Sequence, residues 1–267
     1  MVKGLYTAYT GMMIEQNRMD ILSNNLANSA TNGYKKEGST ARAFEAQLAH
    51  KCHKSSTYNL AKKLGYVNMG TKIGETYTDW SQGNFEVTDN TEDLAIAGDG
   101  FFALSYTNKQ GETSVKYTRD GAFKVNAAGY LVTKDGDYVL NQNGAMNGDA
   151  GRGNYVQIDP TMPFRVNELG YIIQNNQTIG RVGVVDFEDY NYLQEYGENM
   201  YDLVDGGRSV ASDATVEQGV LEKSNVNVVS EMVDMITVSR AYEANQKVIT
   251  SIDSTLDRAV NNVGRVQ

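Results

Sequence analysis

The feature that most constrains this chain is a pair of apolar stripes, one at each end of the sequence. From about Leu5 to Leu26, apolar residues recur every three or four positions, with Gln16 as the polar exception. From about Val226 to Val263 the same spacing continues over a longer stretch. An isolated helix cannot bury its own stripe, so each helix needs a partner. The sequence therefore predicts terminal helices that pair as a coiled coil, with each other or with neighbouring chains.

Most residues that we expect at an assembly interface lie on these two stripes. On the N-terminal stripe they are Leu5, Tyr9, Met12, Met19, Leu22 and Leu26. On the C-terminal stripe they are Val228, Met235, Val238, Tyr242, Asn245, Ile249, Ile252 and Leu256. Asn245 is a polar residue at a seam position, of the kind that fixes register at some cost in stability. Ser224 or Asn225 is a candidate N-cap, with Asn227 as the alternative. The simpler interpretation is a long helix packed only on its own β-domain.

The region between the helices, from about Gly70 to Val216, has short alternating apolar runs separated by turn pairs. Asp99-Gly100, Asp120-Gly121 and Asp135-Gly136 are turn signals of this kind. The segments FKVNAAGYLV (123–132) and FRVNELGYII (164–173) resemble each other, and each predicts a β-hairpin. The predicted fold class is therefore α+β, with paired terminal helices and a β-rich middle domain of short antiparallel strands and hairpins.

These patterns divide the chain into four expected segments. Residues 1–36 form an N-terminal helix and a turn motif, and residues 37–69 form an extended linker. Residues 70–216 form the middle domain, and residues 217–267 carry the C-terminal helix. Within the linker, Ala41 to His50 could form a short helix, and Lys51 to Leu64 are expected to be extended or loosely ordered.

Composition excludes several classes of protein. The formal net charge of -9 and the pI near 4.8 argue against a nucleic-acid partner, which requires clustered Lys and Arg. The single cysteine, Cys52, excludes an intramolecular disulfide framework. The sequence has no run of about 20 apolar residues, so it predicts no membrane-spanning helix. The N-terminal residues, with Glu15 and Asp20, do not match a cleaved signal peptide.

No motif for catalysis, cofactor binding or metal binding stands out. Walker, dinucleotide-binding and nucleophile-elbow patterns are missing from the sequence. His50, Cys52 and His53 could ligate a metal, but a structural zinc site needs four ligands, so chance clustering is the better interpretation. Asp135 to Asp149 fails the EF-hand pattern because Val139 takes a ligand position. We therefore predict no enzyme activity, no cofactor and no metal.

Three blocks together resemble a known family. They are GLYTAYTGMMIEQNRMDILSNNLANSATNGYKK (4–36), the segment QGNFEVTDNTEDLAIAGDGFFAL (82–104) followed by YTRDGAFKVNAAGYLVTKDG (117–136), and QGVLEKSNVNVVSEMVDMITVSRAYEANQKVI (218–249). In combination they resemble the bacterial flagellar basal-body rod and hook family, closest to its distal rod subunits. The stretch from Phe44 to Ile73 is similar in placement to a segment of those subunits. A proximal rod subunit with a middle domain and a hook subunit are the alternatives within the family.

The resemblance implies a structural role. The terminal segments would form the inner layer of a helical tube that transmits motor torque to the hook, with the middle domain outside. The motif residues Asn25, Asn28 and Asn225 would join the assembly surface. The partners would be further copies of the chain, the proximal rod and hook subunits, the flagellar export apparatus and the ring proteins around the rod. The subunit would leave the cytoplasm through that apparatus without a cleaved signal peptide and reside in the basal body. From a different class, a secreted β-rich adhesin or binding module is the alternative.

Overall fold

Two units make up the structure, a computed structural model that describes residues 2–51, 62–197 and 199–263. The helical unit contains Met1–Ala27, Lys36–Asp79 and Asn227–Gln267, and the β unit contains Asn28–Lys35 and Trp80–Val226. The middle domain was expected to start at residue 70, whereas the structure groups residues 70–79 with the helices. It also groups Asn28–Lys35, expected with the N-terminal helix, with the β unit.

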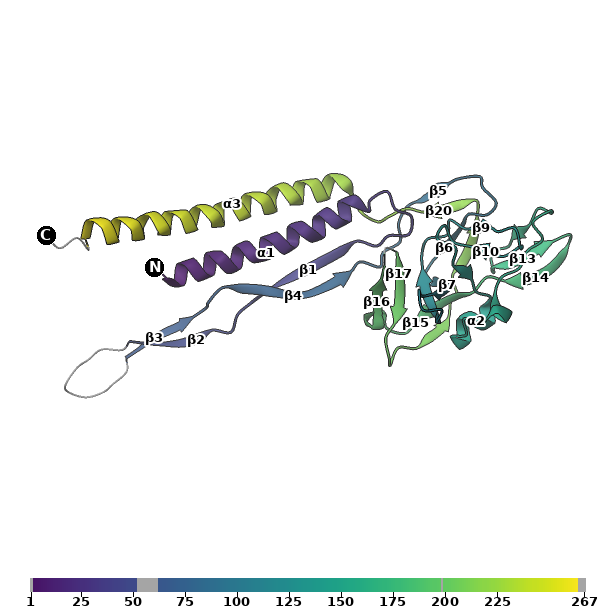
Figure 1. Ribbon diagram of the computed structural model, residues 1–267, viewed down its shortest axis with the longest axis horizontal. Coiled ribbons are helices and arrows are strands. Elements are labelled where there is room, and N and C mark those ends of the chain that lie inside the picture. Colours follow the sequence, from purple (N-terminus) through teal and green to yellow (C-terminus); the bar gives the residue numbers. More distant parts are fainter. Residues whose placement is uncertain (1, 52–61, 198, 264–267) are drawn as a thin grey trace. The chain divides into compact units, whose positions relative to one another are not determined.

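The helical unit is built around two long helices, α1 (Val2–Ala27) and α3 (Val228–Arg258), which contact each other along their lengths (Figure 1). A π-helical turn, Ala259–Val263, extends α3. Asn227 is the N-cap of α3, because its Oδ1 accepts hydrogen bonds from the backbone N–H groups of Val229 and Ser230 at 3.1 and 3.2 Å. The alternative N-cap in the sequence is thus the correct one.

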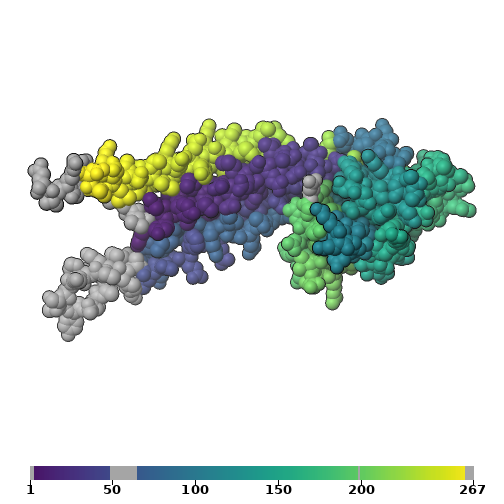
Figure 2. Space-filling view, viewed as in Figure 1, coloured from purple at the N-terminus to yellow at the C-terminus, as the bar shows by residue number. Residues whose placement is uncertain are grey.

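Two antiparallel strand pairs complete the helical unit. They are β1 (Glu37–Ala43) with β4 (Thr71–Thr78), and β2 (Gln47–Lys51) with β3 (Lys62–Val67). The short helix predicted from Ala41 to His50 is therefore wrong, because pairing with distant strands overrides local helix propensity. Helix α1 lies between α3 on one side and β1 and β4 on the other (Figures 1 and 2). The pair of β1 and β4 contains a bulge, at which the Thr40 hydroxyl satisfies both the N–H and the C=O of Glu75.

The β unit consists mainly of antiparallel strands. Its largest sheet in the described residues has nine strands in the order β16-β17-β8-β7-β11-β10-β9, with β15 paired to β7 and β18. The strands of this sheet are β7 (Phe101–Thr107), β8 (Thr113–Thr118), β9 (Lys124–Val125), β10 (Leu131–Val132), β11 (Tyr138–Val139), β15 (Val184–Phe187), β16 (Leu193–Tyr196), β17 (Met200–Leu203) and β18 (Ser209–Ala211).

Smaller elements surround this sheet. One three-stranded sheet contains β12 (Arg165–Val166), β13 (Tyr171–Gln174) and β14 (Gln177–Arg181). Two further pairs are β19 (Thr215–Gln218) with β6 (Leu94–Ala97) and β20 (Val220–Glu222) with β5 (Phe85–Val87). The short helical pieces are α2 (Gln142–Asn147) and the 3-10 turns Arg152–Asn154 and Tyr190–Tyr192.

Strand β7 explains why the β unit has a substantial core. Phe102 and Leu104 belong to one cluster of buried apolar residues, whereas Phe101 and Ala103 belong to a second. Successive side chains of a strand point to opposite faces of its sheet, so both faces are covered at β7. Its continuous apolar run is typical of a strand buried on both sides. The predicted α+β class, with terminal helices and a β-rich middle of short antiparallel strands, is confirmed.

The two similar ten-residue segments both form the predicted hairpin. Residues 123–132 contain β9 and β10, and residues 164–173 contain β12 and most of β13. In the first turn, Asn126 Oδ1 accepts from the N–H groups of Ala128 and Tyr130, and in the second, Asn167 Oδ1 does the same two and four residues later. Gly129 and Gly170 follow with φ of 83° and 79°, a conformation that favours glycine. The same four-residue turn chemistry is thus used twice.

Candidate assembly site

The contact between α1 and α3 has an antiparallel heptad register. A Cβ added at Gly4 would lie 3.6 Å from Ile252 Cδ1, and one added at Gly11 would lie 3.0 Å from Asn245 Nδ2. Near the other end, Asn25 Nδ2 lies 3.3 Å from Glu231 Oε2. The contacting pairs are thus 4 with 252, 11 with 245 and 25 with 231, so each step of seven or fourteen residues forward along α1 equals the step backward along α3. This regularity is what a heptad seam requires.

The structure places the predicted seam residues of α3 on its less exposed face. Val238 is buried, and the half-buried members are Met235, Tyr242, Asn245, Ile249 and Ile252. Val228 and Leu256, near the two ends of α3, are exposed. On α1, Tyr9 is half exposed, Asn25 is fully buried, and the half-buried members are Leu5, Met12, Met19, Leu22 and Leu26. Asn28 and Asn225 lie in the β unit.

Small residues on α1 form part of the seam that sequence reasoning missed. Gly4 and Gly11 contact α3, and Ala8, between them, is buried. The distance between packed helices depends on the side chains at their contact, so small residues allow close approach. The signal was present in the sequence as small residues at positions 4, 8 and 11, one residue before the apolar stripe that we followed.

A buried polar network joins α1, β1 and α3 within the helical unit. Asn25 donates from Nδ2 to the C=O of Glu37 at 2.8 Å, and its Oδ1 accepts from the Glu37 N–H at 3.0 Å. Glu231 is fully buried and forms an ion pair with Lys36. The hydrogen bond to Glu231 is the main cause that raises the pKa of Lys36 above its ordinary value. The network therefore fixes the end of α1, the start of β1 and the start of α3 in one arrangement.

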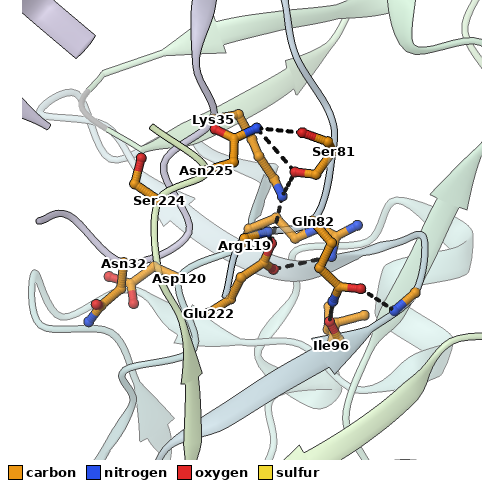
Figure 3. A network of polar contacts seen from close by, with 12 residues as sticks. Asn32, Lys35, Ser81, Gln82, Ile96, Arg119, Asp120, Glu222, Ser224 and Asn225 are labelled. Atoms are coloured by element: carbon orange, nitrogen blue, oxygen red, sulfur yellow. Dashed lines mark hydrogen bonds and ion pairs between the residues drawn. The ribbon is translucent and has the colours of Figure 1, made fainter. Parts of the chain in front are cut away.

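A second buried network lies in the β unit (Figure 3). Lys35 Nζ lies 2.6 Å from Glu222 Oε1, and Arg119 Nη1 lies 3.3 Å from Glu222 Oε2. All three side chains are buried. Gly83 also donates its N–H to Glu222 Oε1 at 2.9 Å. One carboxylate thus balances two buried cations, and it connects four segments of the chain that are distant in sequence.

Ser81 extends this network to the predicted residue Asn225. The C=O of Ser81 accepts from Lys35 Nζ at 2.9 Å and from Asn225 Nδ2 at 3.1 Å, and Asn225 Nδ2 also reaches Ser81 Oγ at 3.0 Å. Asn28 has a local role instead, since its C=O accepts from the Thr31 N–H at 3.1 Å. Asn28 and Asn225 therefore form contacts within the β unit, whereas the apolar stripes form the contact between α1 and α3.

Two exposed apolar stripes remain on the helical pair. On α1, Tyr6, Tyr9 and Met13 are exposed along one face. On α3, a stripe near the N-terminus contains the exposed residues Val229, Met232, Val233 and Ile236. Exposed apolar patches of this kind mark surfaces that interact with other molecules.

Comparisons with known proteins agree with this architecture. Residues 5–35 match the family model described as flagella basal body rod protein, and residues 95–186 match the flagellar hook protein FlgE/F/G D1 domain. Residues 217–262 match the C-terminal model of the flagellar basal body rod FlgEFG proteins. The three matches cover the two helices and a large part of the β unit.

Relatives match over the whole length. The flagellar basal-body rod protein FlgG of Buchnera aphidicola subsp. Baizongia pistaciae is 33% identical, over 97% of this chain and 98% of the relative. The flagellar hook-basal body complex protein FlhO of Bacillus subtilis and the flagellar basal-body rod protein FlgF of Caulobacter vibrioides are each 31% identical over 100% of both chains. The chain belongs to the flagellar basal-body rod protein family. Proteins of this family are structural subunits of the basal body.

The described residues of this rod protein contain no candidate metal site or membrane-spanning helix. In that part of the chain, no group of three or more His, Cys, Asp or Glu side chains could hold a metal ion. Cys52 and His53 lie outside the described residues, and for His50 only the backbone, in β2, is described. None of the described helices is long and apolar enough to cross a membrane.

The ion pair of Lys36 predicts a loss of stability on mutation. Lys36→Met leaves the fully buried Glu231 carboxylate without its cation, although Asn25 still donates to it, and we expect the free energy of unfolding to fall by about 3 kcal/mol. Thermal unfolding followed by helical circular dichroism measures this loss, with Lys247→Met, at an exposed position on α3, as the control. The Lys36→Met, Glu231→Met double variant should recover part of it. Equal melting of the Lys36→Met variant and the wild type would contradict the role of the pair.

Asp120 predicts a pH-dependent effect in the β unit. Burial raises the pKa of its carboxyl above the ordinary value, against the opposing effects of the Ala122 N–H and Lys134. The folded state therefore binds the Asp120 proton more tightly than the unfolded state does. The resulting stabilisation of the folded state is complete below the ordinary pKa of the carboxyl and is lost as pH rises through the pKa in the folded state. Asp120→Asn keeps an Oδ1 acceptor for the Ala122 N–H but carries no charge.

We therefore expect the Asp120→Asn variant to be more stable than the wild type at pH 7, with the difference shrinking toward pH 4. Urea unfolding at a series of pH values measures the difference. A difference that does not change with pH would show that burial of this carboxylate is not the cause.

Proposed function

We propose that this rod protein is a subunit of the distal rod, and that it polymerises through its terminal helices into a helical tube that carries motor torque to the hook. The similarity to proteins named FlgG over nearly the full length of both chains is the observation that carries this proposal. The described residues between 37 and 78 support it, because they form two antiparallel strand pairs, of which β1 and β4 contact α1, in the place where the sequence resembles distal rod subunits.

The helical seam supports assembly through the terminal helices. In the proposed tube, α1 and α3 form the inner layer, and the β unit forms the outer layer. Within one chain, the seam of α1 and α3 leaves apolar side chains exposed on both helices. A subunit that adds head to tail around an axis uses unlike surfaces, and such contacts generate an open filament. The partners that we propose are other copies of this chain, proximal rod and hook subunits, the export apparatus and the surrounding ring proteins.

Export of the subunit is part of the same proposal. The flagellar export apparatus would carry it from the cytoplasm to the growing rod without cleavage of its N-terminal segment. Glu15 and Asp20, within the first twenty residues, support this, because charged residues are unlike the apolar core of a cleaved signal peptide.

Electron microscopy of basal bodies from a strain that lacks this protein tests the assignment. We expect the rod to end after its proximal part, with no hook. A complete rod that lacks only the hook would assign the chain to the hook instead. Complete basal bodies with hooks would contradict a role in the rod.

A further inference from the structure

The C-terminal end of α3 extends beyond its partner helix. Gly4 packs against Ile252, and α1 begins at Val2. By the antiparallel register, Val2 lies opposite Ser254, so among the described residues α3 and its π-helical turn continue from Leu256 to Val263 beyond the start of α1 (Figure 1). We call residues 253–261, which begin opposite Lys3 at the last turn of the seam and continue past the start of α1, the overhang. The apolar pattern of the seam continues here, because Leu256 and Val260 are 39% and 69% exposed and four residues apart.

The helical unit also contains an open cavity on another face of α1. It has a volume of about 530 Å³, and its lining includes Tyr6, Thr10, Arg42, Phe44, Met69 and Lys72. Beside the cavity, the backbone at Gly70 lies directly against the side chain of Thr10, because a Cβ added at Gly70 would lie 2.1 Å from Thr10 Oγ1. Tyr6, Phe44 and Met69 present exposed apolar surface there. A concave, mainly apolar surface of this size suits the apolar ridge of an amphipathic helix.

The charges of the overhang and the cavity are complementary. Asp253 and Asp257 are exposed and four residues apart, three residues before Leu256 and Val260 respectively, so the acids flank the apolar ridge. Asp257 Oδ1 accepts from Asn261 Nδ2 at 2.6 Å, which positions that carboxylate at the surface. The cavity contributes two cations, Arg42 and Lys72, and one acid, Glu45. The overhang carries the reverse, two acids and Arg258.

The overhang of a chain is not placed to fill its own cavity. Helix α3 packs on one side of α1, whereas the cavity is formed by α1 together with the strands on the other side (Figures 1 and 2). The helix continues from α3 into the π-helical turn up to Val263. Among the described residues, the overhang of a chain can therefore reach such a cavity only on another chain.

We propose that the overhang of one copy of this chain docks in the cavity of a second copy, with Leu256 and Val260 against Tyr6, Phe44 and Met69. Asp253 and Asp257 then lie beside Arg42 and Lys72. This contact rests on the proposed function as a polymerising rod subunit, and it names one pair of surfaces that joins neighbours. The two surfaces are unlike, so the contact is heterologous and each added copy presents a new cavity and a new overhang. Charge complementarity selects the orientation of docking.

Disulfide trapping in cells tests the contact. A strain that lacks the native protein expresses the full chain with Cys52→Ser, Phe44→Cys and Leu256→Cys, so that the introduced thiols are the only ones in the chain. Oxidation of isolated basal bodies is expected to produce a ladder of covalent multimers. The matched control combines Cys52→Ser and Leu256→Cys with Ile179→Cys, at an exposed position on β14, and should produce no ladder.

Charge reversal separates docking from misfolding. In the same cysteine background, Asp253→Lys with Asp257→Lys should remove the ladder, and the further changes Arg42→Asp and Lys72→Asp should restore it. Complete rods without a ladder from the Phe44→Cys, Leu256→Cys chain would overturn this contact and leave the rod assignment standing. Failure of the wild-type chain to build rods in that strain would overturn the proposed function and this contact together.

Discussion

Replacing Glu222 with alanine is expected to lower the free energy of unfolding of the β unit by about 3–5 kcal/mol, the range for breaking a buried ion pair. Without this carboxylate, Lys35 and Arg119 remain as two buried like charges, and the Gly83 N–H loses its acceptor. Arg119 has little else to compensate, because its Nε is buried without a hydrogen-bond partner in the described residues. The Arg119 guanidinium carbon also lies over the ring of Phe101, 5.2 Å from the ring centroid, which is a weak cation–π contact.

Urea unfolding followed by tryptophan fluorescence measures the effect of Glu222→Ala. Trp80 is the single tryptophan of the chain and packs in the β unit against Phe101 and Tyr201, at ring-centroid distances of 5.5 and 4.9 Å. The matched control is Glu217→Ala, at an exposed acid on neighbouring β19, which should change the free energy of unfolding by no more than about 0.5 kcal/mol. A loss below about 1 kcal/mol for Glu222→Ala, the range of exposed pairs, would contradict the network.

The substitution Gly33→Ala is expected to destabilise the β unit by at least about 2 kcal/mol, because the backbone itself would have to move. Gly33 has φ of 69°, and an added Cβ would lie 2.5 Å from the backbone carbon of Arg119 and from the backbone nitrogen of Asp120. The Gly33 N–H also donates to the C=O of Glu222 at 2.8 Å, so any shift weakens a second contact.

Gly153→Ala is the control for this experiment. A Cβ at Gly153 meets no atom within 4 Å, and its φ is not positive. Both variants are compared by urea unfolding of the full chain. We expect a clear loss in the free energy of unfolding for Gly33→Ala and little change for Gly153→Ala. Equal stability of the two variants would show that the close approach at Gly33 relaxes at little cost.

Elements with local signals could be predicted from the sequence. Helices α1 and α3 follow from a periodic stripe, and the two hairpins at 123–132 and 164–173 follow from their Asn and Gly turn residues. The short helix expected from Ala41 to His50 is instead the end of β1 and most of β2, because nothing within 41–50 reveals the partners of these strands. Residue 43, for example, pairs with residue 71, and only that distant partner makes the segment extended.

The candidate site could be predicted only where it depends on local sequence patterns. Periodicity placed the half-buried face of α3, and the buried Glu231 lies at the same heptad spacing as Val238 and Asn245. The ion pairs were not visible, because Lys35 and Lys36 find Glu222 and Glu231 at sequence separations of 187 and 195 residues. Nothing in the local sequence around Lys35 shows that its side chain becomes completely buried on folding.

The central claim is that the paired terminal helices build the rod. Ile252→Asp places a carboxylate in the seam beside Gly4, whereas Leu169→Asp changes an exposed hairpin turn of the β unit. The most direct measurement is electron microscopy of basal bodies from the deletion strain that expresses one or the other variant. We predict no rod beyond the proximal part with Ile252→Asp and complete rods with Leu169→Asp. Complete rods built from the Ile252→Asp chain would contradict the claim.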